Sequence, residues 1–84
     1  MTNTEAQIIA DIVKAGKQHK AGHYHYVYMY LWYEKSEKCF KYKREDLSTN
    51  IYDPEITITN LTEEQFIEKL VNDYDYNKTV RELY

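Results

Sequence analysis

The stretch from His23 to Glu34, HYHYVYMYLWYE, alternates its side chains with a period of two. In a β-strand, successive side chains point to opposite faces. β-Branched and aromatic residues favour strands, and no Gly or Pro interrupts the run. We therefore predict the central strand of a small sheet over residues 23–34. A ladder of aromatic residues is expected on one face: Tyr24, Tyr26, Tyr28, Tyr30 and Trp32.

Two capping-box sequences predict helices on either side of this strand. Thr4 to Gln7 precedes apolar residues at helical spacing and Gly16, which predicts a helix over about residues 4–15. Thr62 to Gln65 precedes a second apolar stripe and predicts a helix over about residues 63–73. Residues 17–22, KQHKAG, are expected to form a basic loop.

Two further strands are predicted, over residues 39–44 and 55–60, the second with Ile56 and Ile58 on one face. The register between the first two strands follows from burial. A slip of one residue would bring Lys41 and Lys43 onto an apolar face. We therefore expect Leu31 opposite Tyr42 and Tyr33 opposite Phe40. The core face then holds Val27, Met29, Leu31, Tyr33, Phe40 and Tyr42, and the other face holds the aromatic ladder with Lys41 and Lys43.

The fold class expected from this order is α+β. The prediction is one domain over residues 1–84, built as a three-stranded antiparallel meander with helices packed on one face, in the order α-β-β-β-α. The tail over residues 74–84 has two alternatives. It either forms a short third helix from about Asn77 on, or it folds over the aromatic ladder and makes that face a second small core.

The charge and cysteine content exclude several classes of protein. The net charge is −3, but residues 14–44 carry +6 and residues 53–84 carry −5. A single cysteine, Cys39, cannot form an internal disulfide, which favours a reducing cytoplasm. The residues MTNTEAQ show neither the basic region nor the apolar region of a signal peptide, and no apolar stretch is long enough to cross a membrane. We therefore expect a cytoplasmic location and no membrane contact.

Catalytic and metal-binding patterns are weak in this sequence. His19, His23 and His25 invite a zinc interpretation, but no carboxylate lies near them in sequence. No histidine is placed to activate Cys39, and phosphate-loop and catalytic-triad signatures are missing. We expect no metal, no cofactor and no enzymatic activity.

Two surfaces are candidates for binding. The aromatic ladder with Lys41 and Lys43 resembles either a protein-binding surface or a face that stacks nucleic-acid bases. The acidic C-terminal half offers carboxylates that can pair with the Arg and Lys side chains of a nucleic-acid-binding protein. The acidic candidates are Glu63, Glu64, Glu68, Asp73 and Asp75.

Two families resemble this chain in the order of its elements. The double-stranded-RNA-binding domain shares the order α-β-β-β-α, but that resemblance implies a basic start to the last helix, where this chain has Glu63 and Glu64. The small size, the tyrosine content and the acidic C-terminal half also resemble small phage-encoded inhibitors of host defence, including anti-CRISPR proteins. That resemblance implies a compact domain that occupies the nucleic-acid-binding surface of a nuclease.

The sequence therefore predicts a small non-enzymatic protein-binding module, and the second resemblance implies an anti-CRISPR-like inhibitor encoded by a phage or mobile element. Its expected partner is a bacterial defence nuclease or a nuclease–nucleic acid complex, whose nucleic-acid-binding or catalytic surface it would occupy. The alternative is a single-stranded nucleic-acid-binding domain that uses the tyrosine and lysine face. A homodimer is compatible with either function.

Overall fold

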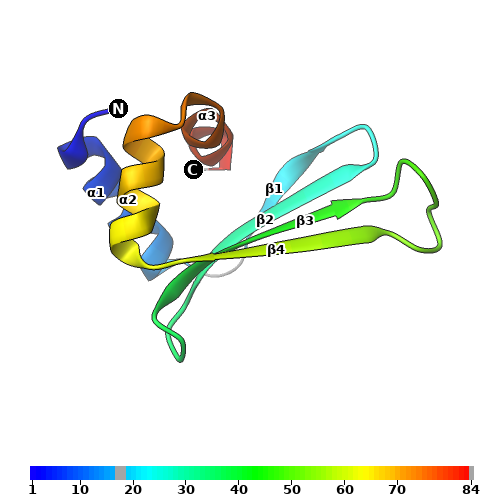
Figure 1. Ribbon diagram of the computed structural model, residues 1–84, viewed down its shortest axis with the longest axis horizontal. Helices are drawn as coiled ribbons and strands as arrows, with labels where there is room; N and C mark the ends of the chain where they lie inside the picture. Colours follow the sequence, from blue (N-terminus) through cyan, green and yellow to red (C-terminus); the bar gives the residue numbers. More distant parts are fainter. Residues whose placement is uncertain (17–18, 84) are drawn as a thin grey trace.

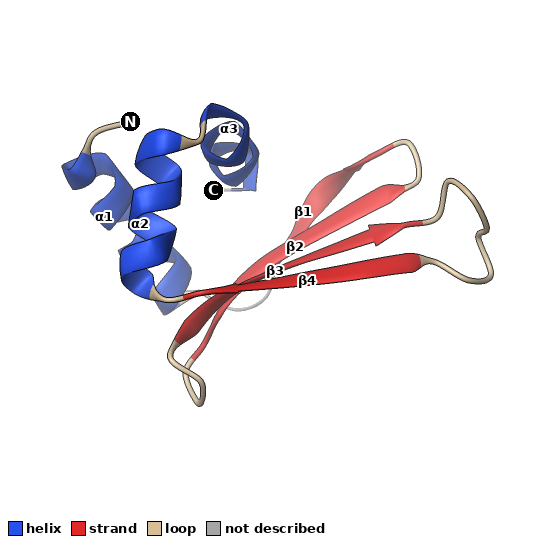
Figure 2. Cartoon of the chain, in the orientation of Figure 1, coloured by secondary structure: helices blue, strands red, loops and turns tan. Residues whose placement is uncertain are grey.

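The computed structural model describes residues 1–16 and 19–83, and residues 19–24 by their backbone alone. The predicted α+β class, the antiparallel meander and the extra C-terminal helix are confirmed (Figure 2). The elements are α1 (Asn3–Ala15), β1 (His19–Tyr24), β2 (Val27–Glu34), β3 (Cys39–Asp46), β4 (Glu55–Leu61), α2 (Glu63–Asn72) and α3 (Tyr74–Leu83).

The sheet has the order β1-β2-β3-β4, and each strand runs antiparallel to its neighbours. The three helices lie at one end of the sheet, on one side of it, and the other end projects beyond them (Figure 1). The core lies between helices and sheet, where the rings of Phe40 and Phe66 stack with centroids 4.1 Å apart. Its buried residues are Ala6, Ala10, Val13, Leu31, Phe40, Phe66, Leu70 and Val80.

The predicted register between the two central strands is confirmed. Leu31 pairs with Tyr42 and Tyr33 pairs with Phe40. Leu31 and Phe40 are fully buried, while Tyr33 and Tyr42 pack against the core from its edge. Val27 and Met29 occupy the same face but are only half-buried and lie outside the core cluster, because the helices cover only one end of the sheet.

The single strand that we predicted over residues 23–34 is wrong at its N-terminal end. The chain turns at His25 and Tyr26, and residues 19–24, most of which we had assigned to a loop, form the additional strand β1. His25 adopts φ 53°, a left-handed conformation that glycine or asparagine usually occupies in such turns. The turn therefore carries no sequence signature, and pairing with β2 decides the local structure.

The helix ends follow capping rules, with one correction. The capping box of α1 uses Thr2 and Glu5, so our assignment of Thr4 and Gln7 is wrong by two residues. Both pairs fit the same signature, and the structure selects the earlier one. The box of Thr62 and Gln65 at the start of α2 is confirmed.

The C-terminal segment packs on the helical side of the sheet. α3 begins at Tyr74, three residues earlier than we predicted, and the ring of Tyr76 meets those of Tyr42 and Phe66 at 6.1 Å each. Val80 is fully buried in the same core. The alternative in which the tail covers the aromatic ladder is therefore wrong for residues 74–83.

Candidate functional site

The face of the sheet opposite the helices is the strongest candidate for a binding surface. Residues that pair across antiparallel strands share a face, so the register defines three rows that cross β2, β3 and β4. We call this surface the open sheet face. Its rows are Tyr28–Glu45–Ile56, Tyr30–Lys43–Ile58 and Trp32–Lys41–Asn60.

The open sheet face is apolar at two of its three strands. Tyr28, Tyr30 and Trp32 of β2 are half-buried, while Ile56 and Ile58 of β4 are 50% and 52% exposed. The buried core residues of all three helices belong to a cluster with Leu31 and Phe40, which lie on the other face. Among the described residues, no helix packs on the open sheet face.

The lysines of this face are neutralised by neighbouring carboxylates. The Nζ atom of Lys41 lies 2.7 Å from Glu37, whose carboxylate raises the pKa of Lys41 by accepting its hydrogen bond. The Nζ atom of Lys43 lies 3.0 Å from Glu45 and 5.7 Å from the ring centroid of Tyr30. The face thus presents aromatic surface with paired charges rather than a strip of free positive charge.

Hydrogen bonds also fix one end of the face. The indole Nε1 of Trp32 donates to a carboxylate oxygen of Glu34 at 3.2 Å, and the hydroxyl of Ser36 donates to the other oxygen at 3.0 Å. The polar edge of Trp32 is therefore satisfied within the chain, which leaves the ring itself as the contact surface.

The structure brings together only part of the predicted aromatic ladder. Tyr28, Tyr30 and Trp32 share one face of β2. Tyr26 lies in the β1–β2 turn and is 58% exposed. Tyr24 belongs to β1, where it pairs with Val27, and its side chain lies outside the described residues.

Sequence reasoning missed the contribution of β4 to the open sheet face. We had noted the apolar alternation of Ile56 and Ile58, but without a register to β3 their face could not be assigned. The structure pairs Lys43 with Ile58 and Glu45 with Ile56. The two isoleucines therefore stand beside the paired lysine and glutamate, on the side away from the helices.

Two of the five acidic candidates have structural roles. Glu63 forms an ion pair with Lys14 that links α2 to α1. Asp73 caps α3 by accepting a hydrogen bond from the backbone N–H of Tyr76 at 3.1 Å, and this bond lowers the pKa of the Asp73 carboxyl. The exposed acidic candidates are Glu64, Glu68 and Asp75.

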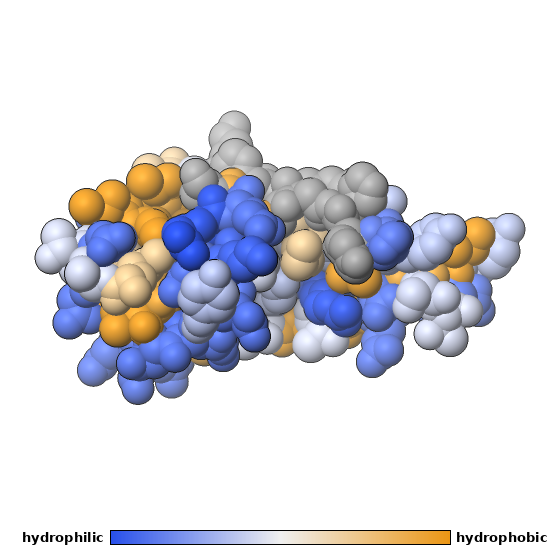
Figure 3. All heavy atoms as spheres, turned by 90° about the horizontal axis from the view of Figure 1, so that it is seen from above, coloured by the Kyte–Doolittle hydropathy of each residue, from blue (hydrophilic) through white to orange (hydrophobic). Residues whose placement is uncertain are grey.

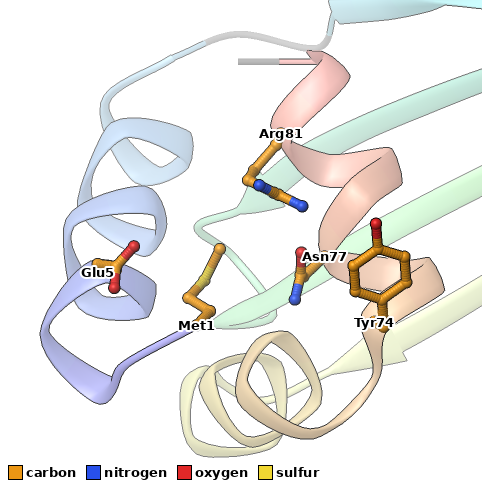
Figure 4. Close-up of a pocket in the computed structure, with 5 residues that line it drawn as sticks. All are labelled: Met1, Glu5, Tyr74, Asn77 and Arg81. Atoms are coloured by element: carbon orange, nitrogen blue, oxygen red, sulfur yellow. The ribbon is translucent and has the colours of Figure 1, made fainter.

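A pocket of about 300 Å³ lies between the start of α1 and α3 (Figure 4). Its walls carry the charged side chains of Glu5 and Arg81 and the ring of Tyr74, and Met1 completes the lining. The amide of Asn77 is buried at this site and donates to the carbonyl oxygen of Leu70 at 3.1 Å. Glu5 already serves the capping box of α1, so its carboxylate is engaged in holding the helix start.

Exposed apolar side chains also occur on the helical end of the molecule, where Figure 3 shows apolar atoms gathered. Ile8 and Ile12 of α1 are 55% and 48% exposed. They are four residues apart and so lie on one side of the helix. This patch consists of two side chains and is smaller than the open sheet face.

His23 and His25 do not share a strand, as the predicted strand over residues 23–34 had implied, whereas His19 and His23 both belong to β1. His25 occupies the β1–β2 turn, and His19 and His23 pair with Leu31 and Tyr28 in the register. The part of the chain that the structure describes contains no group of three or more His, Cys, Asp or Glu side chains placed to hold a metal ion. None of the described helices is long and apolar enough to cross a membrane.

Comparison with protein-family models, with curated proteins and with solved structures finds no match to this chain. Its function is therefore argued from its fold and its surface.

Proposed function

We propose that this chain is a non-enzymatic protein-binding module and that the open sheet face is its binding surface. The observation that carries the proposal is the uneven covering of the sheet. Three helices pack on one face, and the opposite face displays Tyr28, Tyr30, Trp32, Ile56 and Ile58. These apolar side chains lie on β2 and β4 with the paired charges of β3 between them, and exposed apolar patches mark interaction sites in soluble proteins.

The residue types favour a protein partner. Tyrosine and tryptophan are enriched among residues that dominate binding energy at protein interfaces. A tyrosine ring supplies apolar contact area, while its hydroxyl bonds to water when the partner is absent. A face that is alternately wet and covered is therefore better served by tyrosine than by leucine or valine.

The charges on the face argue against the nucleic-acid alternative. Binding of single strands combines aromatic stacking with a groove of unpaired positive charge. Here Lys41 and Lys43 are paired with Glu37 and Glu45, and the whole chain carries a net charge of −3. A protein ligand needs no such positive groove, so protein binding is the better-supported function.

For the class of partner we propose a bacterial defence nuclease, with the chain acting as an anti-CRISPR-like inhibitor. This part of the proposal rests on the resemblance in size, composition and element order to small phage-encoded inhibitors. The exposed carboxylates of Glu64, Glu68 and Asp75 are available to pair with Arg and Lys side chains that otherwise hold phosphates. They would form a second contact region on α2 and α3, on the side of the sheet opposite the open sheet face.

The test compares two double variants with the wild type. Tyr28→Ser with Tyr30→Ser removes two rings from the open sheet face, and Glu64→Lys with Glu68→Lys reverses two exposed charges of α2. Each tagged protein is used to capture partners from bacterial lysates, and captured proteins are identified by mass spectrometry. The purified partner is then titrated with each variant, and its nuclease activity is measured with and without the wild-type chain.

We expect the tyrosine variant to bind the purified partner at least about 100-fold more weakly, as two interface hot spots imply, while its circular dichroism spectrum is unchanged. The wild-type chain should inhibit cleavage. Loss of binding in the charge variant alone would move the site to the acidic helix. Tight binding of a single-stranded oligonucleotide that weakens steeply with salt would instead establish the nucleic-acid alternative.

A further inference from the structure

The two edges of the sheet differ in how they are protected against pairing with another chain. An edge strand presents unpaired N–H and C=O groups, and soluble proteins block such edges with bulges, lysines or covering elements. β1 has a register shift between Lys20 and His23, contains a lysine, and contacts α3. These are the protections expected of an edge that stays free.

The β4 edge lacks the register shift and the lysine that protect β1, although α2 contacts this strand. Its seven residues, EITITNL, contain no lysine and no proline, and its pairing with β3 runs from Glu55 to Leu61 without a register shift. Residues 55–60 are all exposed. The sequence is rich in β-branched residues, which favour strand pairing. This edge can therefore form backbone hydrogen bonds with a strand of another chain.

Exposed apolar side chains occur on β4 and in the loop that leads into it. Ile56 and Ile58 of β4 are half exposed, and the loop before β4 carries Ile51 and Tyr52, which are 55% and 90% exposed. Isolated apolar residues on a surface are ordinary, but a group at one unpaired edge indicates an interface.

We propose that β4 pairs antiparallel with β4 of a second copy of this chain, about a two-fold axis at Thr57. In this register Thr57 stands opposite its own counterpart, Ile56 stands opposite Ile58 of the partner subunit, and Glu55 stands opposite Thr59 of the partner subunit. The pairing is self-complementary, because both isoleucine pairs form and no two carboxylates meet. A two-fold axis at Ile58 would instead place Ile56 opposite an asparagine and lose both isoleucine pairs.

The dimer would join the two open sheet faces into one. On each copy, three rows about 6.8 Å apart on three strands about 4.8 Å apart cover roughly 300 Å² of flat area. A stable interface buries about 800 Å² on each side, which is more than one copy offers. Pairing through β4 continues the row of Tyr28, Glu45 and Ile56 across the axis and doubles the face to roughly 600 Å² of flat area, which is closer to that size.

The test uses one substitution at two positions of β4. Thr57→Lys places two lysines directly opposite each other across the axis, whereas Thr59→Lys places each lysine opposite Glu55 of the partner subunit. Both positions are exposed and lie on the face that does not carry the proposed binding residues. Sedimentation equilibrium over a range of concentrations measures the mass of each protein against the 10.2 kDa of one chain.

We expect the wild type and Thr59→Lys to dimerise, and Thr57→Lys to raise the dimer Kd by about tenfold or more, since opposed like charges in an interface are strongly unfavourable. A wild-type chain that stays monomeric, or a Thr57→Lys chain that dimerises as tightly as the wild type, would overturn the proposal. Equal loss of the dimer in both variants would overturn the register.

A second measurement covers the case in which a lysine variant does not fold. In a Cys39→Ser background, Thr57→Cys should form an intersubunit disulfide under mild oxidation, because directly opposed strand residues have Cβ atoms about 5 Å apart. Thr59→Cys should not, because in this register it faces Glu55. Cross-linking at 59 without cross-linking at 57 would contradict the axis at Thr57.

Discussion

Leu31 and Met29 lie on the same face of β2 and are two residues apart, yet the structure predicts very different costs for shortening them. Leu31 is completely buried among Phe40, Phe66 and the other core residues. Met29 is half-buried and lies outside the core cluster. Comparing the stability of the two alanine variants therefore tests how far along β2 the helices cover the sheet.

The magnitude follows from burial. Replacing Leu31 with alanine removes three carbons, worth about 2.4 kcal/mol at about 0.8 kcal/mol each, and the cavity left behind brings the cost to about 3–4 kcal/mol. Met29→Ala should cost about 1 kcal/mol, because much of that side chain is already in contact with water. A domain of this size has a total stability of about 4–13 kcal/mol, so the leucine variant should lose between about a quarter and nearly all of it.

The assay is equilibrium unfolding in urea, followed by the fluorescence of Trp32 on the opposite face and by circular dichroism. With a slope near about 1 kcal/mol/M, the midpoint should fall by about 3 M for Leu31→Ala and by about 1 M for Met29→Ala. Equal shifts for the two variants would show that the helices cover the whole face, and would refute the arrangement on which the open end of the sheet depends.

Two further predictions concern pH. Thr2 lowers the pKa of Glu5 by a hydrogen bond, Ser48 lowers that of Asp46, and the backbone N–H of Tyr76 lowers that of Asp73. The three ionised carboxylates therefore stabilise the fold at neutral pH, and this stabilisation is lost as the pH falls below about 4. Asp73→Asn keeps a side-chain oxygen that can accept the capping hydrogen bond, but it has no carboxyl to titrate. The melting temperature of this variant should therefore fall less between about pH 4 and 2 than that of the wild type. An equal fall in both proteins would contradict the capping role of the Asp73 carboxylate. Burial raises the pKa of the Tyr42 and Tyr76 hydroxyls, so stability should be lost as pH rises above 10. Tyr76→Phe keeps the ring contacts and should melt less readily than the wild type at high pH, and equal melting would contradict this.

The register of β2 and β3 could be predicted because one physical cost decided it. A slip of one residue would have brought Lys41 and Lys43 onto the face of Leu31, and the structure keeps them on the other face. The helices were found from capping boxes and apolar stripes, and the error at α1 arose where Thr2 and Thr4 both fit the signature.

The turn at His25 could not be predicted in the same way. It uses a left-handed conformation at a residue that is not a usual turn former, inside a segment whose alternation fits a strand. The energy of pairing β1 with β2 outweighs the local cost, and that energy is a property of the tertiary fold. The contribution of β4 to the candidate site also depends on strand pairing. The face on which Ile56 and Ile58 lie follows from how β4 pairs with β3, and the sequence alone did not give that register.

The two proposed interfaces share Ile56 and Ile58 but can still be separated. These isoleucines point out of the open sheet face, while the backbone of β4 forms its edge. Thr57→Lys adds a positive charge to the edge strand on the helical side of the sheet, and it leaves the rings of Tyr28 and Tyr30 in place. Tyr28→Ser with Tyr30→Ser changes the face two strands away from the edge. If both proposals hold, the tyrosine variant should remain a dimer that has lost its partner, and the lysine variant should be a monomer that binds the partner more weakly because only half of the joined face remains.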